Sequence, residues 1–401
     1  MTKTFRVSVV TGQGGGGHYA TYEALRAIAQ RENLPWEFQV TDMDDIITEL
    51  SQAGEVKNAY EMFGFSGHDL YNLMVKGGWT WLWPLKMRLN KLLVKLNYQI
   101  GIETFTRHWQ EQQPDIVVSV MPLYNKGLCA SLQRAKPGTP YLTVMTDFAD
   151  CPPDFWLDPA AGNTLVCGTE KAMEQARSLN ISEERLVRSS GLVIHPDFYQ
   201  KREISPEERA QRRLALGLAP DRATGIITFG GNGASTMLDI ARRLETLSDR
   251  AQFIFACGRN SAVAQSLRGY SGSQPRVVLD FVETIADYLQ LSDFFIGKPG
   301  NVSVSEALAM KLPVITACNR LTMSQERYCA EWIAKQAVGT VMKSFKQVDK
   351  AVENLLQPAT YNQYKANLDT FENRAVYELA ALLSARLETG EIATPTAMAP
   401  V

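Results

Sequence analysis

The sequence predicts an α/β protein with two Rossmann-like, doubly wound domains that face a cleft. Short apolar segments typical of buried parallel strands alternate with helical patterns along most of the 401 residues. A glycine-rich loop follows the first expected strand of each half, at residues 12–17 and 230–233. A chain of this length is also sufficient for two domains with separate cores.

Composition limits the function classes. Hydrophobic residues make up 45% and charged residues 21% of the chain, as in globular proteins, and the net charge of −2 does not favour nucleic acid as a partner. The six cysteines show neither C-x-x-C pairs nor metal-finger spacing, so we expect reduced thiols, no metal site and a cytoplasmic protein. We expect no signal peptide, and no apolar run approaches the roughly 18–20 residues of a membrane span.

The first half begins with a strand at residues 5–10, the glycine loop and a helix at 19–30. Further strands are expected at 37–41, 115–120, 141–146 and 164–166, with helices at 126–135 and from residue 171 onward and leucines at helical spacing from 85 to 96. Residues 42–78 have no firm assignment. Pro196 ends regular structure, so we place the first domain at residues 1–196.

The second half repeats the alternation. Strands are expected at 225–229, 252–256, 277–279, 294–296, 314–316 and 339–342, with helices between them. These elements form a predicted second domain at residues 197–374. Residues 375–401 are expected to be a closing helix and a loose tail.

The segment at residues 298–308 joins a buried strand to a helix through small residues. Such a turn gathers backbone N–H groups and the positive end of a helix dipole, which suits a phosphate. Lys298 adds a positive charge, and Glu306 could accept hydrogen bonds from a diol such as a ribose. An ordinary strand-to-helix turn explains this stretch equally well.

The first glycine loop contains Gly15, Gly16 and Gly17, which let a ligand approach the backbone closely. Its spacing is not that of a dinucleotide fingerprint, so a nicotinamide cofactor is only weakly indicated. His18 follows the loop at the expected ligand edge and is a candidate for acid–base chemistry. Asp147 ends a strand at the same edge, where it either orients His18, acts as a base, or only forms a turn.

Three further segments follow strand ends of the second half. Gly230, Gly231 and Asn232 could present N–H groups to a diphosphate. Phe281 and Val282 could hold a flat base, and Gln325 and Glu326 could bind sugar hydroxyls. Each signal is weak alone, but their order at successive strand ends points to one nucleotide-sugar site.

Residues 77–96 have the pattern of a membrane-surface segment. Trp79, Trp81 and Trp83 alternate before a helix with Lys86, Arg88 and Lys91, leucines at helical spacing and no acidic residue up to Glu103. Tryptophans and a basic amphipathic helix are typical of proteins on anionic membranes. The alternative is a helix whose leucines face the core.

This order of motifs resembles the GT-B glycosyltransferases of family 28, above all the monogalactosyldiacylglycerol synthase branch. The glucosaminyltransferase that forms lipid II is a more distant relative. The resemblance covers roughly residues 5–340, and its motifs are Gly15-Gly16-Gly17-His18, Thr143-Val144-Met145-Thr146-Asp147-Phe148, Val166-Cys167-Gly168-Thr169-Glu170, Phe229-Gly230-Gly231, Phe281-Val282, Lys298-Pro299-Gly300 with Ser303 and Glu306-Ala307, and Gln325-Glu326.

The resemblance implies an inverting transfer of a hexose from a UDP-sugar to a lipid or lipid-linked hydroxyl. It implies no obligatory metal and no tightly bound cofactor, and a peripheral position on the cytoplasmic face of a membrane. Transferred by motif, the implied roles are uracil binding by Val282, ribose binding by Glu306, diphosphate binding by Gly300 and Ser303, donor-sugar binding by Gln325 and Glu326, and service to the acceptor hydroxyl by His18 and Asp147.

The chain also departs from its relatives. Where glycolipid-forming relatives usually have a histidine after the Thr-Asp pair, it has Ala149-Asp150-Cys151-Pro152-Pro153. Tyr19 follows His18 where a basic residue is common, and Asn301-Val302 replaces a Pro-Gly pair. Two alternatives remain. The first is a UDP-sugar 2-epimerase, which would need further acids and a histidine in the cleft, whereas the chain has only four histidines in all. The second is a non-catalytic, membrane-docked protein that binds nucleotide-sugars.

Overall fold

The structure is a computed structural model that describes residues 3–12, 17–52, 83–200 and 204–389. The chain forms two compact units. The first contains residues 1–195, 323–325 and 374–401, and the second contains residues 196–322 and 326–373. The end of the chain therefore belongs to the first unit.

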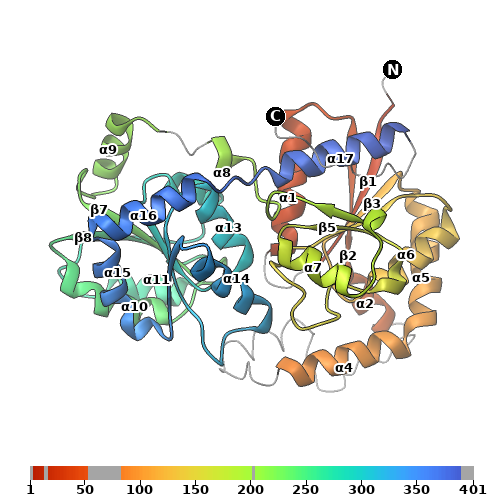
Figure 1. Ribbon diagram of the computed structural model, residues 1–401, viewed down its shortest axis with the longest axis horizontal. Helices are drawn as coiled ribbons and strands as arrows, with labels where there is room; N and C mark the ends of the chain where they lie inside the picture. Colours follow the sequence, from red (N-terminus) through yellow and green to blue (C-terminus); the bar gives the residue numbers. More distant parts are fainter. Residues whose placement is uncertain (1–2, 13–16, 53–82, 201–203, 390–401) are drawn as a thin grey trace. The chain divides into compact units, whose positions relative to one another are not determined.

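The sheet of the first unit has six parallel strands in the order β2-β1-β3-β4-β5-β6 (Figure 1). The strands are β1 (Phe5–Thr11), β2 (Trp36–Asp42), β3 (Ile116–Ser119), β4 (Tyr141–Val144), β5 (Thr164–Cys167) and β6 (Leu186–Arg188). Strand β2 lies on one side of β1, and β3 to β6 follow on the other side. The connections therefore run in opposite directions on the two sides of the boundary between β1 and β3. In open parallel sheets ligands bind at such a point, beyond the carboxyl ends of the strands.

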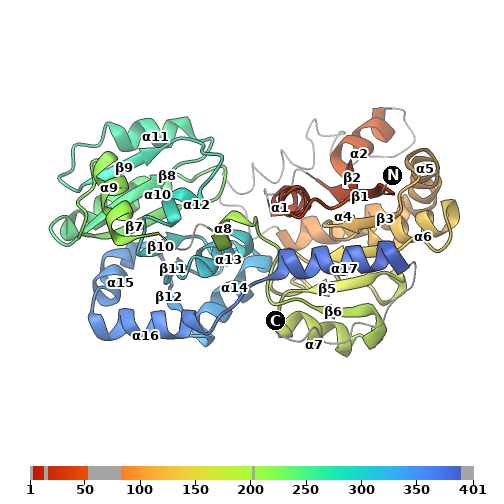
Figure 2. The same cartoon turned by 90° about the horizontal axis from the view of Figure 1, so that it is seen from above.

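Helices lie on both faces of this sheet, as Figure 2 shows from above. They are α1 (Gly17–Arg31), α2 (Met43–Gln52), α4 (Trp83–Leu96), α5 (Tyr98–Gln112), α6 (Asn125–Ala135), α7 (Glu170–Ser178) and α17 (Ala375–Thr389). Helix α17 packs against α1, which joins the end of the chain to its beginning. The strands are apolar on both sides because helices cover both: Val9 and Val10 of β1 are both fully buried.

The sheet of the second unit is also six-stranded and parallel, in the order β12-β11-β10-β7-β8-β9. Its strands are β7 (Ala223–Thr228), β8 (Ala251–Ala256), β9 (Arg276–Leu279), β10 (Phe294–Gly297), β11 (Val314–Ala317) and β12 (Gly339–Met342). Its helices are α8 (Asp197–Gln200), α9 (Pro206–Ala215), α10 (Thr236–Leu244), α11 (Ser261–Arg268), α12 (Ala286–Leu289), α13 (Asn301–Ala309), α14 (Ser324–Lys335), α15 (Val348–Leu355) and α16 (Pro358–Asp369). Here the connections diverge between β7 and β10.

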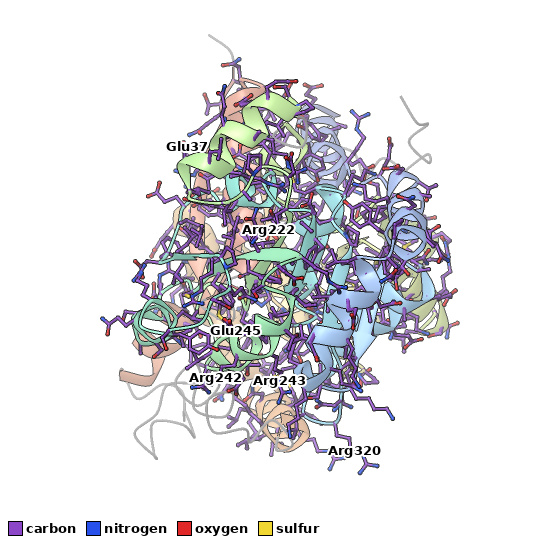
Figure 3. All side chains as sticks on the ribbon, turned by 90° about the vertical axis from the view of Figure 1, so that its left-hand side faces the viewer. Glu37, Arg222, Arg242, Arg243, Glu245 and Arg320 are labelled. Carbon is purple, nitrogen blue, oxygen red and sulfur yellow. The ribbon has the colours of Figure 1, made fainter. Side chains whose placement is uncertain are left out.

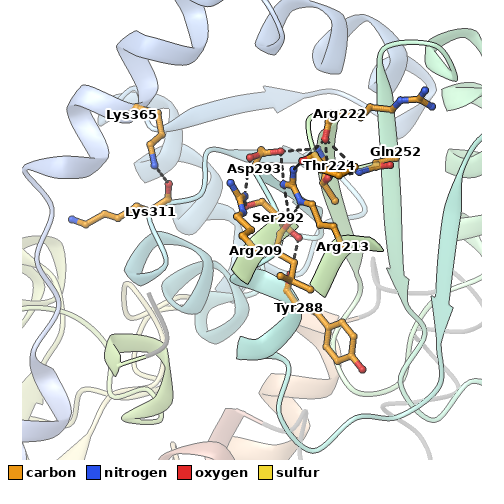
Figure 4. Close-up of polar contacts among 12 residues, drawn as sticks. Arg209, Arg213, Arg222, Thr224, Gln252, Tyr288, Ser292, Asp293, Lys311 and Lys365 are labelled. Carbon is orange, nitrogen blue, oxygen red and sulfur yellow. Dashed lines mark hydrogen bonds and ion pairs between the residues drawn. The ribbon is translucent and has the colours of Figure 1, made fainter. Parts of the chain in front are cut away.

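The core of the second unit is aromatic. Phe253 and Phe255 of β8 and Phe294 of β10 are almost fully buried, and Ile240 of α10 packs into the same cluster. At the amino ends of the strands, Asp293 accepts hydrogen bonds from Arg209 and Arg213 of α9, at 2.8 Å each (Figure 4). This pair of contacts fastens α9 to the start of β10.

The predicted fold class is confirmed, with local differences. Residues 85–109 contain parts of two helices, α4 and α5, which Asn97 separates; its side-chain amide donates to the carbonyl of Leu93 at 2.9 Å. Strand β6 was not predicted because only three residues at the sheet edge form it. All six cysteines are free thiols, and no helix of the described residues is long and apolar enough to cross a membrane.

Candidate active site

His18 lies at the divergence point of the first unit, as the second residue of α1. Its Nδ1 is 3.4 Å from the hydroxyl of Thr146, and the ring also hydrogen bonds with the carbonyl of Val120. Burial lowers the pKa of His18 to about 4, although the Val120 bond and the charge of Asp44 act to raise it. The imidazole is therefore neutral near pH 7.

Asp147 follows β4 and reaches the same edge. It is only 9% exposed, and its Oδ2 accepts a hydrogen bond from the indole N–H of Trp156 at 2.7 Å. The Trp156 ring centroid is 6.0 Å from that of His18. The structure thus brings His18 and Asp147 to one region and adds Trp156, which sequence reasoning did not select.

Asp44 is a second acid that sequence reasoning did not assign to this site. Its backbone N–H donates to Asp42 at 2.9 Å, and its Oδ2 would be 3.3 Å from a Cβ added to Gly12 in the loop after β1. The charge of Asp44 opposes the lowering of the pKa values of His18 and Lys86 by burial. Its position directly after the second strand was the available signal, because carboxyl ends of parallel strands share one edge.

The structure describes only some of the remaining predicted residues of the first unit. Gly17 opens α1, whereas Gly15, Gly16, Trp79 and Trp81 lie outside the described residues. The first residue of α4 is Trp83.

Helix α4 has an exposed apolar face formed by leucines at i, i+3 and i+7. Leu89, Leu92 and Leu96 are 39%, 52% and 70% exposed. Arg88 is exposed beside them, while Lys91 bonds with the carbonyl of Pro153 at 2.7 Å.

Lys86 of α4 lies in a different environment from these exposed leucines. Burial lowers its pKa to about 8, and the charge of Asp44 opposes that shift. Lys86 therefore interacts electrostatically with Asp44, which follows β2.

In the second unit, the glycine turn after β7 and the loop after β10 are neighbours. Thr228 and Gly297, which end these strands, are paired in the sheet. Gly230 adopts φ 75°, a backbone conformation that favours glycine. Asn232 is exposed, and its carbonyl accepts from Asn260 at 3.3 Å. Both loops lie at the divergence point of the second sheet, where a ligand is expected.

Helix α13 starts directly at this edge, with Gly300 as its N-cap residue. Its first-turn N–H groups and dipole therefore face the edge. The hydroxyl of Ser303 donates to the Gly300 carbonyl at 3.2 Å, and Lys298 pairs with Glu326 of α14 at 2.6 Å. Next to Glu326, Gln325 contacts Ser324 at 3.4 Å.

Glu306 lies on α13 one turn beyond these residues and is half-buried. Burial raises the pKa of its carboxyl to about 8. A carboxyl with this pKa is mostly protonated near pH 7.

The next two loops along the sheet place an arginine on an aromatic ring. Phe281, after β9, is 49% exposed, and the guanidinium of Arg259, after β8, lies 4.0 Å from its ring centroid. Val282 beside it is half-buried. A Cβ on Gly231 would be 3.5 Å from Arg259 Nη1, so Arg259 lies between the predicted diphosphate loop and the predicted base site. Sequence reasoning did not select Arg259.

A cavity of about 610 Å³ lies elsewhere, at the amino ends of β7 and β8. Pro220, Arg222 and Arg250 are among its lining residues, and Figure 3 labels Arg222. Because ligands of parallel sheets bind at the carboxyl ends, we do not assign the reaction to it. In the described part of the chain, no group of three or more His, Cys, Asp or Glu side chains could hold a metal.

Two six-stranded parallel units, each with a polar loop cluster at its divergence point, have the architecture of a GT-B glycosyltransferase. Solved structures agree on the fold. MurG of Acinetobacter baumannii aligns over 95% of this chain and 99% of its own, with a TM-score of 0.59 and 11% identity. The UDP-GlcNAc 2-epimerase of Neisseria meningitidis bound to UDP-GlcNAc aligns over 96% and 99%, with a TM-score of 0.58 and 15% identity.

Solved structures of this fold include both glycosyltransferases and epimerases, and sequence comparison distinguishes between these two classes. The family profile described as monogalactosyldiacylglycerol (MGDG) synthase matches residues 18–194, and the glycosyltransferase family 28 C-terminal domain matches residues 226–380. The chain belongs to glycosyltransferase family 28, in the branch of the MGDG synthases, and is a glycosyltransferase. The predicted family and enzyme class are confirmed.

Two curated relatives illustrate this branch. The processive diacylglycerol beta-glucosyltransferase of Bacillus subtilis (strain 168) is 24% identical over 377 residues, which cover 92% of this chain and 91% of that protein. Chloroplastic monogalactosyldiacylglycerol synthase 1 of Arabidopsis thaliana is 25% identical over 376 residues, which cover 88% of this chain but 65% of that protein.

Proposed function

We propose that the protein transfers a hexose from a UDP-sugar to the hydroxyl of a lipid acceptor, with inversion at the sugar carbon. The observation that carries this proposal is the series of neighbouring loops at the carboxyl edge of the second sheet. They offer in turn an aromatic ring at Phe281, a guanidinium at Arg259, a glycine turn at Gly231 and the amino end of α13. That series fits a base followed by a diphosphate.

The donor half of the reaction follows from these groups. Backbone N–H groups around Gly300 and the dipole of α13 stabilise the diphosphate as it leaves with the electrons of the bond to the sugar. Glu306 binds the ribose hydroxyls, Val282 the uracil, and Gln325 and Glu326 the sugar. Lys298, the positive charge near the diphosphate, also pairs with Glu326, one of the two sugar-binding residues in this proposal.

The acceptor half uses the first unit. The acceptor oxygen attacks the sugar carbon from the face opposite the leaving diphosphate, which inverts its configuration. A base must take the hydroxyl proton, and Asp147 does so in this proposal, with neutral His18 beside it to orient the hydroxyl. The low pKa of His18 supports this division of roles.

A lipid acceptor is supported by the relatives' names and by α4. The named relatives act on diacylglycerol or form monogalactosyldiacylglycerol. The exposed leucine face of α4, with Arg88 and Lys95 and no acidic residue on the helix, fits an anionic membrane surface. The protein would act there as a peripheral protein on the cytoplasmic side.

The test is a panel of UDP-sugars offered with diacylglycerol and extracted membrane lipids, with products identified by mass spectrometry and anomeric configuration by NMR. We expect a glycolipid with inverted configuration. Epimerised UDP-sugar would instead support the epimerase alternative, and binding without turnover would support a non-catalytic protein; either result would refute the proposal.

A further inference from the structure

The segment between Asp150 and Trp156 folds around one buried carboxylate. Asp150 is 3% exposed, and its Oδ1 accepts the backbone N–H groups of Phe155 at 3.0 Å and Trp156 at 2.7 Å. Its Oδ2 accepts the N–H of Asp154 at 2.9 Å. Three consecutive backbone amides are therefore fixed by a single side chain. These bonds determine the position of the Trp156 backbone and the direction of its side chain.

Two helices of the same unit hold this segment. The side-chain amide of Gln175, on α7, accepts from the N–H of Asp150 and donates to its carbonyl, both at 2.9 Å. Lys91 of α4 donates to the carbonyl of Pro153 at 2.7 Å and lies 3.7 Å from the carboxylate of Asp154. Contacts with α7 and α4 thus add to the hydrogen bonds that Asp150 makes within the segment.

Trp156 projects from this segment onto Asp147. Its side chain is 2% exposed, so the 2.7 Å hydrogen bond to Asp147 Oδ2 is shielded from water. An indole N–H only donates, which suits an ionised carboxylate as its partner. A bond to one of the two oxygens limits rotation of the carboxylate beside His18.

We propose that Trp156 is a positioning residue that holds the Asp147 carboxylate in the orientation needed to take the acceptor proton, with Asp150 fixing Trp156. This inference rests on the proposed function, in which Asp147 is the base. Proton transfer requires the base to lie within hydrogen-bonding reach of the hydroxyl, and small misplacements reduce rates strongly. A positioning role should therefore affect turnover more than substrate binding.

The first test is Trp156→Phe, which removes the N–H and keeps an aromatic ring. We expect kcat to fall about tenfold or more, with little change in KM for the UDP-sugar and a decrease in Tm no larger than that of the matched control. The matched control is Trp109→Phe: Trp109 is fully buried in the same unit, and its indole donates to Ser131 at 2.9 Å, away from Asp147. The control should keep its kcat.

If Trp156→Phe does not fold, the bicyclic analogue benzothienylalanine, which has sulfur in place of the N–H, is incorporated at position 156 and the same decrease is expected. In the second test, Trp156→Phe is combined with Asp147→Asn. Because both changes would disrupt one contact, the double variant should be no slower than Asp147→Asn alone.

The outcomes separate this inference from the proposed function. Normal kcat in the Trp156 variant, together with an inactive Asp147→Asn variant, would overturn the positioning role and leave the base in place. Full activity of Asp147→Asn would overturn both roles. Absence of any transfer by the wild-type protein would refute the proposed function itself.

Discussion

The guanidinium of Arg259 lies 4.0 Å from the ring centroid of Phe281, although the two residues follow different strands. The face of an aromatic ring attracts a cation, so Phe281 holds the guanidinium at a defined position. That position is beside Gly231, in the turn where the diphosphate of a nucleotide-sugar is expected. Arginine binds phosphate oxygens through paired N–H groups, so the contact keeps an anion-binding group ready at the loop.

We predict that Arg259→Met weakens UDP binding by about 10-fold or more, because a charge-assisted hydrogen bond is lost. Uridine, which lacks the diphosphate, should bind the variant nearly as well as the wild type. Isothermal titration calorimetry of the full chain with both ligands measures the difference.

The control for this prediction is Arg242→Met. Arg242 is exposed on α10 and pairs with Asp239 three residues away at 3.1 Å, so its loss should leave both affinities unchanged. Equal weakening of UDP and uridine in Arg259→Met would mean that Arg259 supports the base site rather than the diphosphate.

The sequence predicted the fold class and the loops of the site because both depend on local patterns. A strand, a glycine turn and a helix can each be predicted from a short stretch of sequence, as around Gly230 and Gly300. Arg259, Asp44 and Trp156 were not selected, because their roles depend on contacts that only the folded chain creates. Trp156, for example, reaches Asp147 only because Asp150 bends the segment between them.

A second prediction concerns the leucine face of α4. The double replacement Leu92→Ser and Leu96→Ser should weaken binding to anionic vesicles by at least about tenfold, because each buried leucine contributes roughly 1.5–3 kcal/mol. Co-sedimentation with phosphatidylglycerol-containing vesicles measures this. Leu214→Ser is the control, since Leu214 is 58% exposed but lies on α9.

The three tryptophans of residues 77–96 are tested in the same assay. Replacement of Trp79, Trp81 and Trp83 by alanine should also reduce binding. Wild-type protein that stays in the supernatant with anionic vesicles would refute the membrane prediction.

The hydrogen bonds of Asp293 lead to a prediction about stability (Figure 4). Asp293→Ala leaves the guanidinium of Arg213, a residue only 4% exposed, without its carboxylate, and should lower the free energy of unfolding by about 3 kcal/mol. Denaturation in urea measures this. Glu353→Ala, which removes the exposed pair with Arg250, should cost no more than about 1 kcal/mol. Equal losses in the two variants would contradict a structural role specific to Asp293.

His18 gives a prediction for turnover and for pH. His18→Ala should lower kcat with less effect on UDP affinity, since His18 lies in the first unit, to which the proposed function assigns the acceptor. Unchanged turnover would remove His18 from the reaction.

Because burial lowers the pKa of His18 from 6.5 to about 4, the folded state binds fewer protons here than the unfolded state. The resulting stability is present above pH 6.5 and is lost as the pH falls toward 4. His18→Asn should remove this part of the pH dependence of unfolding. An identical profile in the variant would contradict the low pKa.

Glu306 gives the last prediction, in which the pH dependence has the opposite sign. Burial raises the pKa of its carboxyl from 4.5 to about 8, so the folded state binds more protons and its stability should fall as the pH rises from about 4.5 to 8. Ionised carboxylates accept hydrogen bonds more strongly than neutral ones, so UDP affinity should increase between pH 7 and pH 9. Glu306→Gln should bind UDP more weakly and without this pH dependence, and Glu306→Ala should weaken binding by about 10- to 100-fold. Calorimetric titration at both pH values decides: equal wild-type affinities, or normal UDP binding by Glu306→Ala, would exclude the carboxylate from ribose binding.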